Sequence, residues 1–126
     1  CHRTVKKDSE KIIPVARAVG EGKPIPWIRI HRLPDHVHFE HRLHVNAGVS
    51  CVSCHGRVDR MERVRQVEPL SMSWCLSCHR NPEGSLRPRE LVTKLDAVFP
   101  DPLGQGRALK ASNHIQPGTD CSTCHL

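Results

Sequence analysis

Three short segments of this 126-residue chain repeat the pattern Cys-x-x-Cys-His, at residues 51–55, 75–79 and 121–125. Thiols at this spacing can each add to one of the two vinyl groups of a single haem, and the histidine that follows is then held beneath the iron as its proximal ligand. The pattern therefore predicts three covalent haem sites. Their thioethers come from Cys51, Cys54, Cys75, Cys78, Cys121 and Cys124, and their proximal ligands are His55, His79 and His125.

The first two thiol pairs also fall within the ligand spacing of a zinc ribbon. A ribbon needs no histidine after each pair, and it leaves Cys121 and Cys124 without a role. Given ten His in 126 residues, a histidine follows all three pairs by chance roughly once in 2,000 cases if positions are independent. Disulfide or thioredoxin-like chemistry is disfavoured because such motifs occur singly, near a βαβ unit that this sequence lacks. Haem attachment is favoured, and a zinc-ribbon interaction module is kept as the weaker alternative.

Aromatic residues make up only 3% of the chain, and there is no Tyr. The whole set is Trp27, Trp74, Phe39 and Phe99. Ordinary domains draw much of their core from such side chains, each of which buries about 150–250 Å². A large, flat, apolar cofactor would fill the space that this chain cannot fill itself. We therefore expect mostly irregular coil with short α-helices and little or no β-structure, organised around covalent haems.

Local patterns predict few regular elements. A short helix is expected over residues 8–19, with Asp8 or Ser9 as the cap and Gly20 or Gly22 at its end; Pro14 predicts a kink or a later start. Residues 23–38 contain three prolines and are expected to be extended.

The clearest helix pattern lies between Ser85 and Phe99. Ser85 is the expected cap, Pro88 would sit in the first turn, and Leu91, Leu95 and Val98 would share a face. Residues 100–120 are rich in Gly, Pro and polar groups and are expected to form a loop.

The formal net charge is +6, but the basic residues are scattered rather than clustered. We therefore expect no nucleic-acid partner. Haem propionates would pair with many of the Arg and Lys side chains. No stretch approaches the about 18 apolar residues of a membrane span, so any attachment to a membrane is expected to come from partners, from a lipid or from sequence upstream.

The remaining histidines and the two methionines are candidates for the distal position above each iron. His41 and His44 are the best candidates, because residues three apart on a helical turn lie on neighbouring faces and can reach two adjacent haems. His31 is the next candidate. His36 and His38 are expected not to bind iron. Weaker distal candidates are His114, Met72 and Met61, since a thioether ligand would raise the haem potential but Met more often fills a core.

Several segments resemble the pentahaem c-type cytochrome subunit of bacterial alternative complex III, a multihaem cytochrome with c3/c7-like haem packing. They are Gly-Lys-Pro-Ile-Pro-Trp-Ile-Arg-Ile-His at 22–31, Leu-Pro-Asp at 33–35, Phe-Glu-His-Arg-Leu-His-Val at 39–45, Gly-Val at 48–49, and Leu-Ser-Met-Ser-Trp-Cys at 70–75. The likeness covers roughly residues 8–80 and the last haem motif, and residues 84–120 do not share in it.

The resemblance implies that Cys1 and His2 are the end of a truncated haem motif, with Cys1 as its second thioether and His2 as its proximal ligand. This gives three complete sites and a fourth half site, where the full family subunit is expected to hold five haems. The chain is then the C-terminal part of a longer single domain. Its parts are a remnant of the preceding haem segment (1–22), a two-haem core (23–80), a helix and loop (81–120) and the third motif (121–126). A mature lipoprotein also begins with Cys, and this alternative stays open.

The resemblance also implies a function, namely electron transfer through several c-type haems as part of a membrane-bound quinol oxidoreductase in a respiratory or photosynthetic chain. Expected partners are an iron–sulfur subunit, integral membrane subunits, and a downstream cytochrome or terminal oxidase. The expected location is the periplasmic side of the bacterial inner membrane, through partners or an N-terminal anchor upstream. The chain is not expected to be catalytic alone. The alternative is a multihaem reductase in which one iron keeps an open position.

Overall fold

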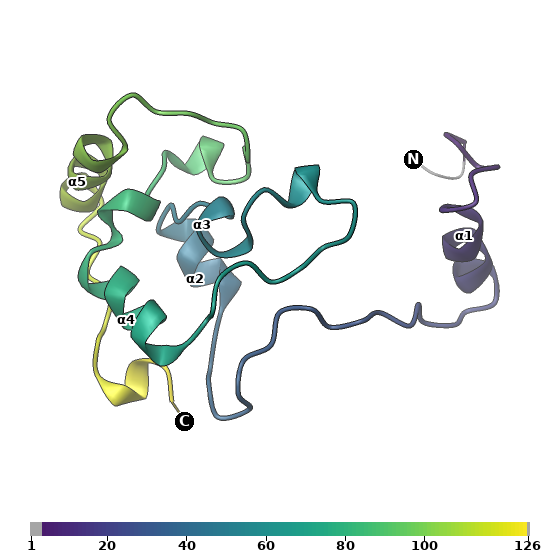
Figure 1. Cartoon of the computed structure of the whole chain (residues 1–126), viewed down its shortest axis with the longest axis horizontal. Coiled ribbons are helices and arrows are strands. Elements are labelled where there is room, and N and C mark those ends of the chain that lie inside the picture. Colours follow the sequence, from purple (N-terminus) through teal and green to yellow (C-terminus); the bar gives the residue numbers. More distant parts are fainter. Residues whose placement is uncertain (1–3, 126) are drawn as a thin grey trace.

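The computed structural model describes residues 4–125 and consists of short helices joined by irregular chain (Figure 1). Within those residues there is no β-strand, only two isolated bridges, so the predicted fold class is confirmed. None of the helices in this part of the chain is both long and apolar enough to span a bilayer. The α-helices are α1 (Ile13–Gly20), α2 (His41–Asn46), α3 (Val52–His55), α4 (Met72–Arg80) and α5 (Pro102–Ser112), and the 3-10 turns are Val58–Arg60, Pro82–Ser85, Arg89–Leu91 and Cys121–Thr123.

The first helix begins later than its sequence pattern alone suggests. Its N-cap is Ile12, which makes no side-chain cap, and Pro14 lies in the first turn. The expected cap at Asp8 or Ser9 is therefore wrong, and Ser9 instead closes a preceding turn by accepting the backbone N–H of Ile12 at 2.8 Å. The reason is that proline has no N–H to donate, so it is tolerated at the start of a helix but not in its interior.

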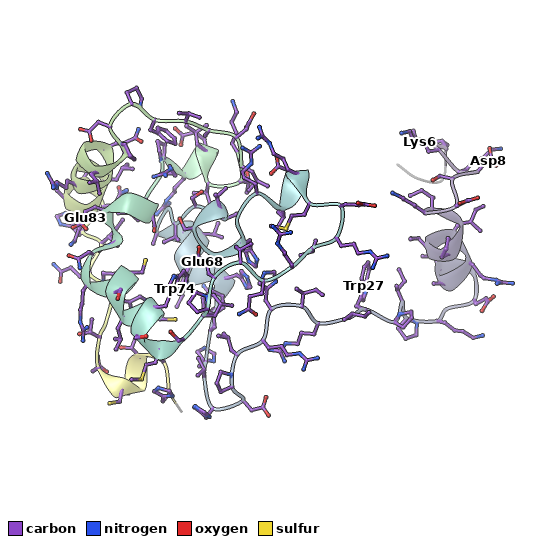
Figure 2. The ribbon with its side chains drawn as sticks, in the orientation of Figure 1. Lys6, Asp8, Trp27, Glu68, Trp74 and Glu83 are labelled. Atoms are coloured by element: carbon purple, nitrogen blue, oxygen red, sulfur yellow. The ribbon has the colours of Figure 1, made fainter. Side chains whose placement is uncertain are left out.

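The chain between α1 and α2 is extended, as predicted, and carries α1 away from the other helices (Figure 1). Its apolar side chains have little to pack against. Trp27 and Ile28 are each 81% exposed, and Figure 2 shows Trp27 standing on this segment apart from the helical body. We call residues 13–35 the arm, and the remaining residues from 36 to 125 the body.

The helix predicted between Ser85 and Phe99 does not form. Two backbone carbonyls of this stretch accept hydrogen bonds from the first residue of the first haem motif and from the residue before it, instead of from amides one helical turn further along. The carbonyl of Ser85 accepts the N–H of Ser50 at 2.9 Å, and that of Val92 accepts the N–H of Cys51 at 3.3 Å. Val98, placed on the expected apolar face, is 89% exposed. Long-range hydrogen bonds to the motif thus override the local apolar periodicity.

The helix of this region lies further on, in the stretch predicted to be a loop. Asp101 caps α5 by accepting the N–H of Gly104 at 2.8 Å, and Pro102 occupies the first turn. Gly106 lies against the backbone carbonyl of Glu83, where any side chain would collide. Lys110 donates to the Glu83 carboxylate at 2.7 Å, and this bond holds the pKa of Glu83 below its ordinary value. Figure 2 shows Glu83 beside α5.

Gly48 makes a second close backbone approach. Its φ of +87° is unfavourable for other residues. A Cβ there would lie 2.6 Å from the carbonyl oxygen of Arg87. The N–H of Arg87 donates to the Gly48 carbonyl at 2.8 Å, beside the antiparallel bridge between Val49 and Leu86. This pairing holds the start of the first haem motif against the chain that follows the second.

The apolar core is very small. Among the described residues only Leu86 and Val92 are hydrophobic and fully buried. The chain exposes 9899 Å², whereas a compact monomer of 14.2 kDa exposes about 6,800 Å². Part of the excess belongs to the arm, but the body also lacks the buried area that stabilises a domain of this length. The scarcity of aromatic residues predicts this shortage.

We expect Gly106→Ala to destabilise the protein by about 1–3 kcal/mol, because the added methyl must push α5 away from Glu83. A loss of stability would be informative, because replacing Gly with Ala in a helix interior ordinarily stabilises the helix. Gly20→Ala is the matched control, because a Cβ at Gly20 has no neighbour within 4 Å. Chemical unfolding of the haem-loaded variants measures both. Equal stability of the two variants would contradict the close contact between α5 and Glu83.

Candidate functional site

The three Cys-x-x-Cys-His motifs each form a single tight turn. In the first, the N–H of His55 donates to the Cys51 carbonyl at 2.9 Å, and in the third His125 donates to Cys121 at the same distance. The second motif lies in the C-terminal half of α4. One helical turn brings both thiols and the imidazole of a motif close together. The six described cysteines, from Cys51 to Cys124, are all free thiols, as thioether formation requires.

The thiols of successive motifs are also near one another. Burial raises the pKa of Cys54 to about 11, with further contributions from Cys78 and Cys75 of the second motif. The pKa of Cys75 is raised by burial and then by Cys124 of the third motif. The first motif is therefore a neighbour of the second, and the second of the third. Cofactors attached to them would form one cluster.

The zinc-ribbon alternative requires the first four thiols to converge on one metal ion. Among residues 4–125, no three His, Cys, Asp or Glu side chains are placed to share a metal ion. The body also lacks the β-hairpins of a ribbon, since the described residues contain no strand. The donor arrangement therefore fits haem attachment and does not fit a structural zinc site.

The second motif histidine faces His44 of α2. The ring centroids of His44 and His79 are 6.1 Å apart. Two imidazoles on opposite sides of one iron hold their centroids about 6 Å apart, because metal–imidazole bonds are about 2 Å long. His79 Nδ1 lies 2.7 Å from the Gly118 carbonyl, and His44 Nδ1 lies 3.0 Å from that of Glu40. If both Nδ1 atoms donate, both Nε2 lone pairs are free for a metal, as in other histidine sites.

The first motif histidine faces two other imidazoles. The ring centroids of His41 and His55 are 6.0 Å apart, with planes 10° from parallel. His31 is closer, with centroids at 4.4 Å and its Nε2 only 3.3 Å from Nδ1 of His55. The His41 separation fits a shared iron better than that of His31. Burial, then His31 and His41, lower the pKa of His55, which favours the neutral form that binds metals.

His41 and His44 lie on a helical turn, as the sequence predicted, and that turn is α2. The ring of Phe39 contacts both, with centroid distances of 4.8 Å to His41 and 4.6 Å to His44. The short helix directs one imidazole toward the first motif and the other toward the second. The prediction that these two residues serve neighbouring haems is therefore consistent with their placement.

The third motif histidine lies beside His36, which the sequence predicted not to bind iron. His36 and His125 have ring centroids 5.4 Å apart and planes 24° from parallel. A backbone bridge between Val37 and His125 brings the two segments together. No local pattern could indicate this pair, because the two residues lie at opposite ends of the body in sequence.

The other candidates lie elsewhere. His114 follows α5 and lines a shallow pocket with Glu83, Arg107 and Lys110. Met61 lies near Gly56, just after the first motif, and Met72 is exposed at the start of α4. Within the described chain, neither His38 nor His114 makes a ring contact with a motif histidine. The predicted half site, Cys1 and His2, lies outside the described residues.

A family model described as cytochrome c7 and related cytochrome c matches residues 37–126. The match includes all three motifs together with α2, and it leaves out the arm and His36. No curated protein matches the chain.

We expect His44→Ala to convert one haem per chain from six-coordinate low-spin to five-coordinate high-spin iron, because the variant removes the imidazole that faces His79. Electron paramagnetic resonance and carbon monoxide binding report the change. His114→Ala is the control, since that ring lies by α5 and should leave the spectrum unaltered. A wholly low-spin His44→Ala protein would show that another group occupies this position.

Proposed function

The chain belongs to the cytochrome c7 family of multihaem c-type cytochromes, and we propose that it relays electrons between protein partners without binding a substrate at iron. The observation that carries this proposal is the pairing of imidazoles. His55 and His79 each face a second histidine at a separation that suits a shared metal. Iron with two axial imidazoles has no open position for a ligand such as nitrite.

Covalent haem c supplies the reversible one-electron chemistry, as the family implies. The residues of the chain determine how the cofactors are held. The thiols anchor them, and α2 connects two sites through His41 and His44, which are three residues apart on one turn. Phe39 packs against both of its histidines and limits their movement. A rigid site changes its geometry little when the charge of the metal changes, which suits electron transfer.

The more specific part of the proposal is a role as the cytochrome subunit of a quinol-oxidising membrane complex of the alternative complex III type. The sequence likeness over residues 22–35, 39–49 and 70–75 supports this role. The exposed apolar side chains of the arm, Trp27 and Ile28, are also what a subunit that packs against partners would carry. The expected partners are an iron–sulfur subunit and integral membrane subunits, with a cytochrome or terminal oxidase as acceptor.

The location proposed for the chain is the periplasmic side of the inner membrane, because thioether attachment in bacteria takes place after export. In this role the chain is not catalytic alone, since quinol oxidation takes place in the partners. The chain offers three complete haem motifs for the relay. The half motif at Cys1 and His2 would belong to a fourth haem, shared with sequence upstream.

The relay is tested by intact mass under denaturing conditions together with ligand binding. We expect a mass increase of one haem for each complete motif, and iron that binds neither carbon monoxide nor cyanide rapidly. The multihaem reductase alternative predicts a high-spin component and rapid ligand binding. A polypeptide whose mass is only that of its amino acids would overturn the proposal altogether.

We expect Cys54→Ala or His55→Ala to remove one haem or to impair its attachment and coordination, and to leave the others attached, because each motif holds its own cofactor. Haem stoichiometry from intact mass and the pyridine haemochrome spectrum measures this. Ser53→Ala changes the same turn without removing a thiol or an imidazole, so it serves as the matched control. A Cys54→Ala protein with wild-type stoichiometry and spectrum would disprove the assignment of this motif.

The role in a quinol-oxidising complex is tested with membranes of the source organism. We expect quinol to reduce the haems only when those membranes are present. Replacing both Trp27 and Ile28 with Ser should weaken this reduction and leave reduction by dithionite unchanged, because these side chains are exposed and belong to the arm and not to a haem motif. Equal reduction of wild type and variant would argue against the arm as the docking segment.

A further inference from the structure

We propose that His36 is the second axial ligand of the haem held by Cys121, Cys124 and His125. This inference rests on the proposed function and extends it to the third motif. The rings of His36 and His125 lie 5.4 Å apart, at 24° from parallel. This separation is within about 1 Å of that expected for two imidazoles on one iron, so a small opening of the pair is enough to admit a metal.

The backbone holds the two residues together. Val37 and His125 form an antiparallel bridge, and the N–H of His38 donates to the Cys124 carbonyl at 2.8 Å. Before the bridge, the N–H of Val37 donates to the Pro34 carbonyl at 3.0 Å, which closes a turn around His36. The imidazole of His36 is therefore brought to the third motif by hydrogen bonds on both sides of it, and not by a flexible tail.

The other two motifs follow the same arrangement. His55 and His79 face His41 and His44 at 6.0 and 6.1 Å. All three facing histidines then come from one stretch of chain, residues 36–44, that runs past each motif in turn. Because the centroid separations of two of the pairs suit a shared metal, we assign the third pair in the same way.

The other described histidines lie elsewhere, and His31 is placed against His55 of the first motif. The backbone of His38 pairs with the third motif, but its ring makes no ring contact with His125. His114 lies in the pocket beside α5, among Glu83, Arg107 and Lys110. His41 and His44 already face the other two motifs. The match to the family begins at residue 37, so membership of the family does not by itself supply this ligand.

With His36 bound, the iron of the third motif would have no open position for an outside ligand. It also gives the segment that joins the arm to the body a direct bond to a cofactor. The junction of arm and body would then be stiff at residues 36–38, and loss of the ligand would loosen the arm as well as change the haem.

The test compares His36→Ala, His36→Met and His38→Ala in the haem-loaded full chain. His36→Ala should keep the wild-type haem mass, and one haem per chain should become high-spin and bind carbon monoxide. His36→Met should return that haem to the low-spin state with a higher reduction potential, because a thioether ligand favours reduced iron. His38→Ala should match wild type in spectrum and potentials.

Two results would overturn the inference. One is a His36→Ala protein whose haems all stay low-spin and closed to carbon monoxide. If that variant does not fold, the reduction potentials of His36→Met provide the test. Potentials equal to those of wild type would then overturn the inference. Either result leaves the relay proposal intact provided that the intact mass still shows attached haem. A haem-free wild-type chain would instead overturn the relay proposal itself.

Discussion

Three pairs of imidazole rings lie close together in the body of this protein, with centroid separations between 5.4 and 6.1 Å. Histidines at positions 36, 41 and 44 face those at 125, 55 and 79. Many of the long-range hydrogen bonds serve to place these rings. The carbonyls of Ser85 and Val92 hold the first motif, and the carbonyl of Gly118 orients His79. Without cofactors between the rings, these contacts would enclose almost no apolar core.

Stability and function therefore depend on the same groups. Only two hydrophobic side chains of the described chain are fully buried, and the covalent haem that the family implies is the group that would supply the missing apolar area. A haem that is lost costs the fold part of its core as well as one redox centre. If these rings hold iron as proposed, each pair of axial ligands is also a structural link, because it joins two segments that are distant in sequence. His44 and His79 are one such pair of rings, and His36 and His125 are more widely separated along the chain.

Sequence reasoning was reliable where the determinant is local. The late start of α1, with Pro14 in its first turn, the extended chain that follows α1 and the helical turn bearing His41 and His44 all depend on neighbouring residues. It was wrong over residues 85–112, where a helix was expected too early. The apolar periodicity there is real, but the carbonyls of that stretch bind the first motif. The helix forms instead around Gly106, which a pattern alone treats as a helix breaker and which the contact with Glu83 requires.

The amino-acid sequence by itself determined the chemistry of this protein, because thiol and imidazole spacing within five residues is sufficient to specify covalent haem attachment. It also indicated that the core would have to come from cofactors. Only the tertiary structure decided which histidine faces which motif, and in particular that His36 lies against His125. The physical reason is that these ring pairs join residues far apart along the chain. The bridge and hydrogen bonds that hold His36 beside His125 leave no periodic pattern in the sequence.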